Sequence, residues 1–583
     1  MKKIISLLIL SALIGSDYYF LQLAITPWVV GAIAALVVYL ILAFRFAPKT
    51  VGKISRKLLQ IAKKLPESRK ITTKSDDWSE WFAQQSKDGF KITFENENHK
   101  TPWSDEVSPD NVHPEYPRPQ LVRDRWINLN GLWNFNVINK DVESNKEFPG
   151  QILVPFPVES ALSGINRPIY ATERMWYKRT FVVPTDWKGE RIILNFGAVD
   201  WEAKVYVNGA LQVEHVGGYT PFSADITDAV EFNKDNEIVV VVYDPTDAYD
   251  YENNEGLRQL GKQSLHPDMI TYSAVSGIWQ TVWLEPAPAH RIERIVTTNC
   301  NVAEGYAEIA VDSNLGNEGL TARITLKEDG SVYTNKATRS VMVEPANLKL
   351  WTPDTPYLYE VTVELLDGET VLDSIETYFA IREVGKKKVN GNVVFTINDE
   401  PIFHHGPLDQ GYFPDGQYTA PTDEALAWDL VQTKEMGFNM TRKHIKVEPA
   451  RWYYHADRLG IMVWQDMIGN YDVHNADPDQ FFAYISNHSP LGHLREMVID
   501  HDAEANGRSK ESQAQFYKEL TEMVEMTRFF PSVVVWSPFN EFWGQFKANA
   551  AVDLIRNIDH IFGTMTDECE FRIDFLLDRF ASE

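Results

Sequence analysis

Uncharged hydrophobic residues dominate the first part of the chain. Residues 20–44 form an apolar run of 25 residues without a charged side chain, and about 20 helical residues suffice to cross the hydrocarbon core of a bilayer. A shorter run, 4–14, follows two lysines and is typical of either a signal peptide or, extended to about residue 24, a second span. The pattern predicts an N-terminal transmembrane segment, with a buried core helix as the alternative.

A basic stretch follows the apolar run directly. It holds ten Lys and Arg residues between 45 and 74, and apolar side chains recur at helical spacing from Ile54 to Leu65. This predicts a basic amphipathic helix on an anionic lipid surface, with a solvated charge run as the alternative. Positive flanks stay on the cytoplasmic side of a membrane. We therefore expect residues 1–75 to form a membrane anchor that contacts lipid, and the body to lie on the cytoplasmic face.

Short alternating segments fill the middle of the chain. Residues 76–110 are polar and show little periodicity, which predicts a linker. From 111 to 287 the hydrophobic period is two, as in 201–207, which ends at an Asn-Gly turn typical of hairpins. The same period continues from 288 to 384. These lengths predict a jelly-roll β-sandwich over 111–287 and an immunoglobulin-like sandwich over 288–384.

Strand-like and helix-like segments alternate after residue 385. Predicted strands at 402–405, 438–442, 461–464 and 533–536 are each followed by a predicted helix, at 422–437, 448–459, 513–529 and 547–558. Four strand–helix units in succession indicate a parallel α/β sheet. A (β/α)8 TIM barrel needs eight such units and about 250 residues. We therefore expect 385–583 to be the N-terminal half of such a barrel.

Composition narrows the function classes. A hydrophobic content of 44% is ordinary for a globular protein. Two cysteines, Cys300 and Cys569, exclude a disulfide framework and give no zinc pattern, and no metal or cofactor is expected. Residues 1–74 carry a net charge of +10, which leaves −36 for the rest of a chain whose total is −26. So acidic a body repels phosphate backbones, and nucleic acid is not expected as a partner.

Candidate site residues lie where the predicted barrel strands end, because barrel enzymes place their catalytic groups at the carboxyl face. In chain order these residues are His404, His405, Asp409, Arg442, His444, Trp464, Gln465, Asp466, Asn540 and Glu541, with Trp536 in the last strand itself. Aromatic side chains flank Glu541. Desolvation by such neighbours disfavours an ionised carboxyl group, so we expect the pKa of Glu541 to be raised, as suits a general acid.

The segment 531–541 resembles the acid/base signature of glycoside hydrolase family 2, which contains β-galactosidases, β-glucuronidases and β-mannosidases. Asn439 and Arg442 resemble a second signature of that family, and 452–464 continues it at the family's spacing. Upstream, 114–119, 129–133, 154–160 and 277–279 resemble the family's sugar-binding domain. The resemblance covers about residues 111 to 560.

This resemblance implies a retaining β-glycosidase with a β-linked oligosaccharide or glycoside as substrate, and β-galactosidase is the expected type. It implies that Glu541 is the acid/base residue and that Asn540 hydrogen-bonds the sugar, while Arg442 organises the site or forms a structural salt bridge. We expect Arg442, His444, Asp409, Trp464, Asp466 and Trp536 to line the substrate site. Asp466 could also be a capped loop carboxylate.

Two departures from the family pattern bear on the sugar. The family commonly has His three residues after the signature Arg, where this chain has Ile445 preceded by His444. The loop 405–412 also lacks the Asn-Arg-His of the best-known members. The pocket is therefore expected to differ in shape from theirs.

The resemblance places the nucleophile on a later barrel strand. No carboxylate among the 42 residues after Glu541 follows an apolar strand, so we expect a chain truncated within its catalytic barrel, without the nucleophile and without turnover. Two alternatives stay open: a non-catalytic carbohydrate-binding pseudoenzyme and a membrane scaffold protein.

Overall fold

The structure, a computed structural model, describes residues 78–246, 258–265, 267, 271–469, 510–540 and 546–559. All of these belong to one compact unit, Ser75–Glu583. The predicted membrane anchor, residues 1–75, lies outside the described residues. Among the helices within the described ranges, none has the length and apolar character that a membrane span requires.

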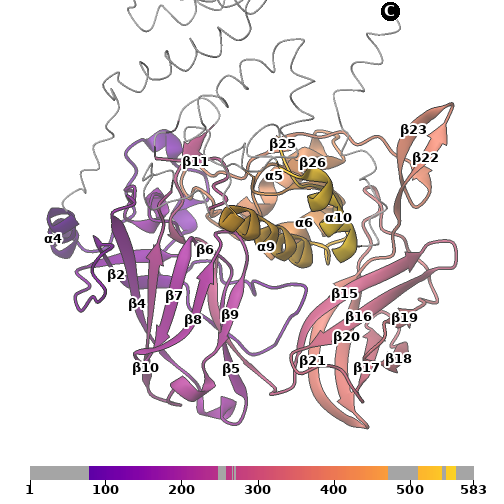
Figure 1. Cartoon of the computed structure of the whole chain (residues 1–583), viewed down its shortest axis with the longest axis horizontal. Helices are drawn as coiled ribbons and strands as arrows, with labels where there is room; N and C mark the ends of the chain where they lie inside the picture. The colour runs from indigo at the N-terminus through magenta and orange to yellow at the C-terminus, as the bar shows by residue number, and fades with distance from the viewer. Residues whose placement is uncertain are drawn as a thin grey trace, which may run out of the picture. The chain divides into compact units, whose positions relative to one another are not determined.

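Two antiparallel sheets form the first sandwich of the described body (Figure 1). The larger has the order β3-β2-β4-β10-β7-β8 and the smaller the order β1-β14-β5-β9. Their strands are β1 (Ile127–Asn128), β2 (Gly131–Asn139), β3 (Gly150–Val154), β4 (Glu173–Val182), β5 (Arg191–Phe196), β7 (Glu202–Val207), β8 (Ala210–Val216), β9 (Phe222–Asp225), β10 (Asp235–Tyr243) and β14 (Val282–Ala287). Short pairs are β6 (Val199–Asp200) with β13 (Gly277–Ile278), and β11 (Gln263–Ser264) with β12 (Tyr272–Ser273). The period of two predicted these strands because alternate side chains face the core, as Ile192, Leu194 and Phe196 of β5 do.

A helix lies in the segment predicted as a linker. α4 (Trp78–Asp88) buries Trp78 and Phe82 in the core of the first sandwich. The Trp78 Nε1 donates a hydrogen bond of 2.8 Å to Glu173. The prediction of a linker over 76–110 therefore needs correction, since two aromatic residues four positions apart give this polar segment one apolar helix face.

The second sandwich is built from sheets of order β15-β16-β19 and β18-β17-β20-β21. Its strands are β15 (Ile292–Asn301), β16 (Tyr306–Ser313), β17 (Thr321–Leu326), β18 (Val332–Lys336), β19 (Val341–Val343), β20 (Tyr359–Asp367) and β21 (Thr370–Phe379). A small antiparallel sheet then follows, β22 (Val384–Val389), β23 (Asn392–Ile397) and β24 (Glu400–Pro401). Two successive sandwiches confirm the architecture predicted from the hydrophobic period.

A parallel sheet of order β25-β26-β27-β28 forms the last part of the described body. It alternates with helices in the order β25 (Leu408–Asp409), α5 (Asp423–Glu435), β26 (Met440–Lys443), α6 (Ala450–Leu459), β27 (Met462–Asp466), α9 (Lys510–Thr527), β28 (Val533–Ser537) and α10 (Ala548–Ile558). Figure 1 shows these helices beside the strands. The strand predicted at 402–405 is instead the short β25. Pro407 precedes it and has no N–H, so it cannot donate to the ladder with β26.

Candidate functional site

Arg442, Asp466 and Asn540 meet at the carboxyl edge of the parallel sheet. The Arg442 side chain binds Asp466 in a fork, with Nε 2.9 Å from Oδ1 and Nη2 2.9 Å from Oδ2. The same Nη2 donates a 2.8 Å hydrogen bond to Oδ1 of Asn540. Since the Asn540 carbonyl is engaged by this bond, its NH2 group is the part that can donate to a ligand oxygen.

Asp466 is the centre of this cluster. Its side chain is fully buried at the end of β27 and also lies 2.8 Å from Nδ1 of His444. A buried carboxylate with an arginine fork and an imidazole around it fixes both of those side chains in place. Arg442 and His444 occupy the oxygens of Asp466, so Asp466 is suited to orient these two side chains.

Trp464 lies on the same side of the sheet as Arg442, because the register pairs the two residues directly. Its Nε1 donates a 2.9 Å hydrogen bond to Nδ1 of His404, whose ring stacks on Phe395. Burial lowers the pKa of His404 to about 4. His404 is therefore neutral near pH 7 and holds the indole of Trp464 at a set angle beside the cluster.

The structure places Asp409 and Trp536 away from this cluster. The register aligns Asp409 with Lys443, Lys443 with Gln465, and Gln465 with Trp536, so these four residues share the opposite side of the sheet. Trp536 is buried, and its Nε1 donates to Thr527 of α9 at 3.2 Å. The sequence expectation that both residues line the site neglected the alternation of side chains along a strand.

A second charged cluster lies behind the first, and sequence reasoning missed it. Lys443 Nζ is 2.7 Å from both Asp409 and Glu448, and Lys446 Nζ is 2.9 Å from Glu448. Lys446 also donates to the carbonyl oxygens of Gly411 and Tyr418, which fastens the loop after β25. Burial lowers the pKa of Lys446 to about 8. The repeated charges from 442 to 448 beside a buried strand were the available signal.

His405 and Gln465 make hydrogen bonds that connect the elements around the site. Gln465 is fully buried and accepts a 2.6 Å hydrogen bond from Tyr453, while the His405 carbonyl accepts from Asn439 N at 3.0 Å. The predicted acid/base residue, Glu541, lies directly after Asn540 but outside the described residues. Within the ranges that the structure does describe, no group of three or more His, Cys, Asp or Glu side chains could hold a metal ion.

Three sequence profiles match most of the body. They are "Glycosyl hydrolases family 2, sugar binding domain" over residues 118–288, "Glycosyl hydrolases family 2" over 290–382, and "Glycosyl hydrolases family 2, TIM barrel domain" over 388–562. Together they match more than half of the chain.

Similar curated proteins include a β-galactosidase of Thermoanaerobacter pseudethanolicus, 27% identical over 50% of this chain and 39% of its own length. A β-glucuronidase of Paenibacillus borealis is 28% identical over 73% of this chain and 69% of its own length. The chain thus spans between about two fifths and two thirds of these relatives. The crystal structure of Ruminococcus gnavus β-glucuronidase is similar with a TM-score of 0.60 at 19% identity, covering 77% of this chain and 73% of that one, which supports the fold.

Proposed function

Because the chain belongs to glycoside hydrolase family 2, we propose that its carboxyl-edge site binds a terminal β-linked pyranoside for hydrolysis with retention. The observation that carries the proposal is the chain of contacts from Asp466 through Arg442 to Asn540. It fixes an amide donor in the residue that directly precedes Glu541 in the sequence. A sugar hydroxyl next to the scissile bond is the acceptor that such a donor fits.

In the proposed reaction Glu541 donates a proton to the glycosidic oxygen as the bond to the anomeric carbon breaks. A second carboxylate attacks that carbon, and water later releases the sugar with Glu541 as the base. Asp466 does not suit the nucleophile's part, because Arg442 and His444 occupy its oxygens. Its part is to hold Arg442 against Asn540. The expectation that the nucleophile is missing from residues 1–583 stays a prediction.

For the sugar we propose a β-glucuronide in place of the β-galactoside expected from the sequence. The support is that relatives from Paenibacillus borealis, Streptococcus agalactiae and Pongo abelii, each aligned over 73% of this chain, are named β-glucuronidases. The relative named β-galactosidase aligns over 50%.

The test measures binding and turnover separately on the purified chain. Aryl β-glucuronide, β-galactoside and β-mannoside are offered to the wild type, to Glu541→Gln and to Glu424→Gln, an exposed carboxyl on α5 that serves as the matched control. The proposal is supported if the wild type binds the β-glucuronide more tightly than the other two glycosides and if Asn540→Ala weakens this binding. Turnover lost only in Glu541→Gln would overturn the expectation of a missing nucleophile. A lack of binding to any of the three glycosides would overturn the proposed site.

The membrane location also stays a proposal. Its support is the apolar run 20–44 followed by ten basic residues. Protection of the body from external protease in intact cells is the expected result, and cleavage of the body there would contradict it.

A further inference from the structure

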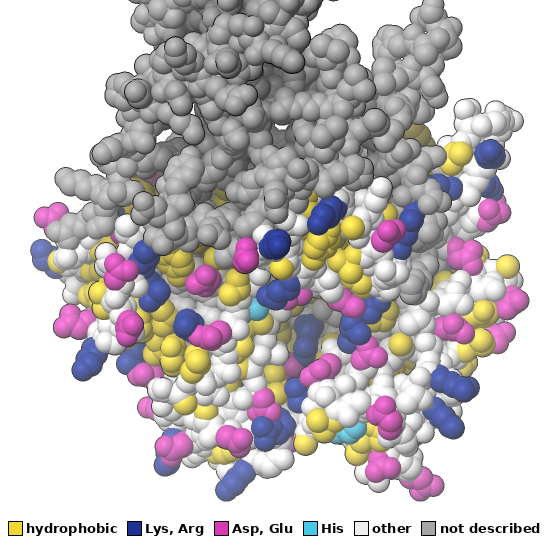
Figure 2. Space-filling view, in the orientation of Figure 1, with side chains coloured by type: hydrophobic (Ala, Val, Ile, Leu, Met, Phe, Trp, Pro, Cys, Tyr) yellow, Lys and Arg dark blue, Asp and Glu magenta, His cyan; other side chains and the backbone are white. Residues whose placement is uncertain are grey.

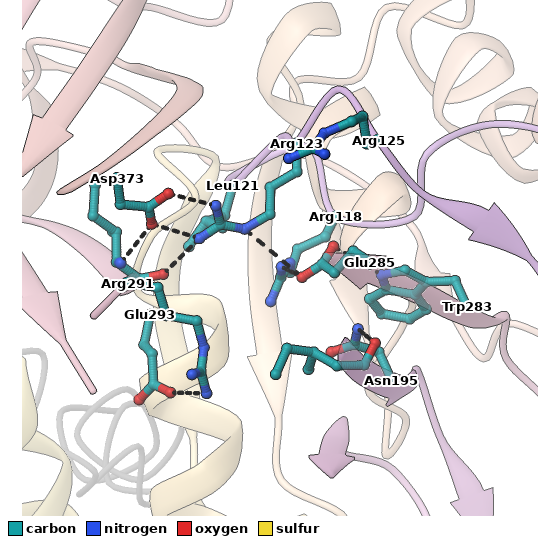
Figure 3. A network of polar contacts seen from close by, with 12 residues as sticks. Arg118, Leu121, Arg123, Arg125, Asn195, Trp283, Glu285, Arg291, Glu293 and Asp373 are labelled. Atoms are coloured by element: carbon teal, nitrogen blue, oxygen red, sulfur yellow. Dashed lines mark hydrogen bonds and ion pairs between the residues drawn. The ribbon is translucent and has the colours of Figure 1, made fainter. Parts of the chain in front are cut away.

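A polar cavity lies between the two β-sandwiches, apart from the carboxyl-edge site. Its volume is about 240 Å³, and its walls include Arg118, Arg123, Asn195, Glu285, Arg291 and Glu293. Figure 3 shows its central part, with Arg118 between Arg123 and Trp283 and with Asn195 nearby. None of these residues belongs to the parallel sheet. A cavity of this size exceeds by far the roughly 10–15 Å³ that one water needs.

Hydrogen bonds and ion pairs fix the side chains that wall this cavity. Arg123 binds Asp373 of β21 through two hydrogen bonds of 2.7 Å, and the backbone N–H of Ile292 donates to the same carboxylate at 2.7 Å. On the other side, Tyr116 and Arg118 both donate to Glu285. The cavity is therefore a preformed feature of the seam between the sandwiches, with its polar groups set in position.

Asn195 and Arg118 together point to a bound ligand. It lies on the outer side of β5, opposite the core residues Leu194 and Phe196, yet only 4% of its surface is exposed. Its Nδ2 makes one long contact, 3.3 Å to the carbonyl of Ile193 on the same strand. Arg118 lines the same cavity, and among the described residues its buried Nε has no hydrogen-bond partner. Buried amide and guanidinium groups normally find partners, and a bound polar molecule would supply them.

The charges around the cavity select a neutral ligand. The positive groups Arg118, Arg123 and Arg291 are matched by three carboxylates, Glu285, Asp373 and Glu293. An anion would therefore add an uncompensated charge, in a chain whose net charge is already −26. Figure 2 likewise shows acidic and basic side chains interspersed over the visible face of the body. Hydroxyl groups both donate and accept, so a polyhydroxylated ring fits the mixed donors and acceptors of this wall.

A second cavity shares Arg118 with the first as a lining residue. It measures about 80 Å³, and its walls include Trp279, Trp283 and Gln280. The Nε2 of Gln280, a residue with 7% exposure, has no hydrogen-bond partner in the described part of the chain. Aromatic faces beside unpaired polar groups match the apolar C–H faces and polar rim of a pyranose.

We propose that the cavity walled by Arg118, Asn195 and Glu293 is a non-catalytic binding site for a neutral hexopyranose unit. Asn195 hydrogen-bonds two adjacent hydroxyls, and Arg118 donates from Nε to a third. The site does not depend on turnover at the carboxyl edge.

The experiment titrates the full chain with methyl β-D-glucopyranoside and methyl β-D-galactopyranoside, with inorganic sulfate and glucuronate as anionic controls. Calorimetry gives the affinity. We expect a Kd on the order of 1 mM for a neutral glycoside. Asn195→Leu should weaken this binding about tenfold or more, which corresponds to about 1.4 kcal/mol. Asn540→Ala should leave it unchanged.

A second variant, at a more exposed position, tests the proposal if Asn195→Leu does not fold. Glu293 is half exposed on the cavity rim, and Glu293→Gln gives the cavity one excess positive charge. We expect this variant to gain affinity for glucuronate while it still binds the neutral glycosides. Three results would overturn the proposal: no neutral glycoside binds, sulfate binds in preference to sugar in the wild type, or binding is lost in Asn540→Ala and kept in Asn195→Leu.

Discussion

Two arginine–aspartate pairs use the same chemistry in two different settings. Arg123 and Asp373 join the two sandwiches with side chains that are 8% and 2% exposed. Arg442 and Asp466 join two strands of the parallel sheet, but the arginine is 31% exposed while its partner is fully buried. In the first pair Arg123 donates to Asp373 and to the carbonyl oxygen of Ile292. In the second the arginine reaches past its partner to Asn540.

This difference separates a structural pair from an orienting one. A fully buried pair is costly to break on one side, because the remaining charge has neither water nor a partner. A partly exposed arginine can be hydrated when its aspartate is removed. Removing that aspartate therefore affects the geometry of the site more than the stability of the fold.

Breaking the buried pair should have the largest effect on stability. Arg123→Met leaves the Asp373 carboxylate with the N–H of Ile292 but no cation, and we expect the free energy of unfolding to fall by about 3–5 kcal/mol. Urea unfolding measures the loss. The double variant Arg123→Met/Asp373→Leu should recover most of it, since it removes both charges.

The matched control for this variant is an exposed pair. Lys204 and Glu214 lie across β7 and β8 with both side chains about half exposed. Lys204→Met should change the free energy of unfolding by less than about 1 kcal/mol. Equal losses in Arg123→Met and Lys204→Met would show that burial does not decide the value of these pairs.

Breaking the orienting pair should affect binding as well as stability. Asp466→Asn replaces one carboxylate oxygen with an NH2 group and removes the negative charge. The charge-assisted hydrogen bonds with Arg442 and His444 are therefore lost. We expect a stability loss of about 2 kcal/mol. We also expect about tenfold weaker binding of the aryl β-glucuronide, because Arg442 no longer holds Asn540.

Binding of the aryl β-glucuronide by Arg123→Met and by Asp466→Asn distinguishes the roles of the two pairs. Arg123→Met should leave binding of the aryl β-glucuronide at the carboxyl edge unchanged under conditions where the chain is folded. If Arg123→Met weakens this binding as much as Asp466→Asn does, the two pairs are not functionally distinct.

The sequence predicted the elements well because their periods are strong. Segment 201–207 becomes β7, segment 359–365 becomes β20, and the helix predicted at 448–459 is α6 within two residues. Alternating or helical burial leaves a direct trace in the order of apolar residues. The strand ends also named Arg442 and Asp466 together as candidates, and the structure joins them.

What the sequence could not predict depends on side-chain direction and distant pairing. Asp409 and Trp536 follow or end barrel strands, but the register turns them to the other side of the sheet. The pairing of Arg123 with Asp373 joins positions 250 residues apart, and no local pattern marks it. The alternation along β5 predicts that Asn195 faces solvent, yet only 4% of its surface is exposed.

A third buried carboxylate, without an arginine, completes the contrast. Glu519 of α9 is 4% exposed, and Gln515 donates to it at 2.7 Å. Burial is the main cause that raises its pKa from 4.5 to about 8, with the charges of Glu522 and Asp200 acting in the same direction. This glutamate is therefore held in its protonated form near neutral pH.

The sign of the resulting pH dependence follows from proton binding. Between the unfolded pKa of 4.5 and the folded pKa of about 8 the native state binds the extra proton, so stability falls as pH rises through this window. Glu519→Gln keeps the hydrogen-bonding shape and cannot ionise. We expect it to flatten this fall and to be more stable than the wild type by about 1–2 kcal/mol at the upper end of the window. Urea unfolding of both proteins across that range measures the difference, with Glu424→Gln on the exposed face of α5 as the control. Parallel stability curves for the wild type and Glu519→Gln would contradict the raised pKa of Glu519.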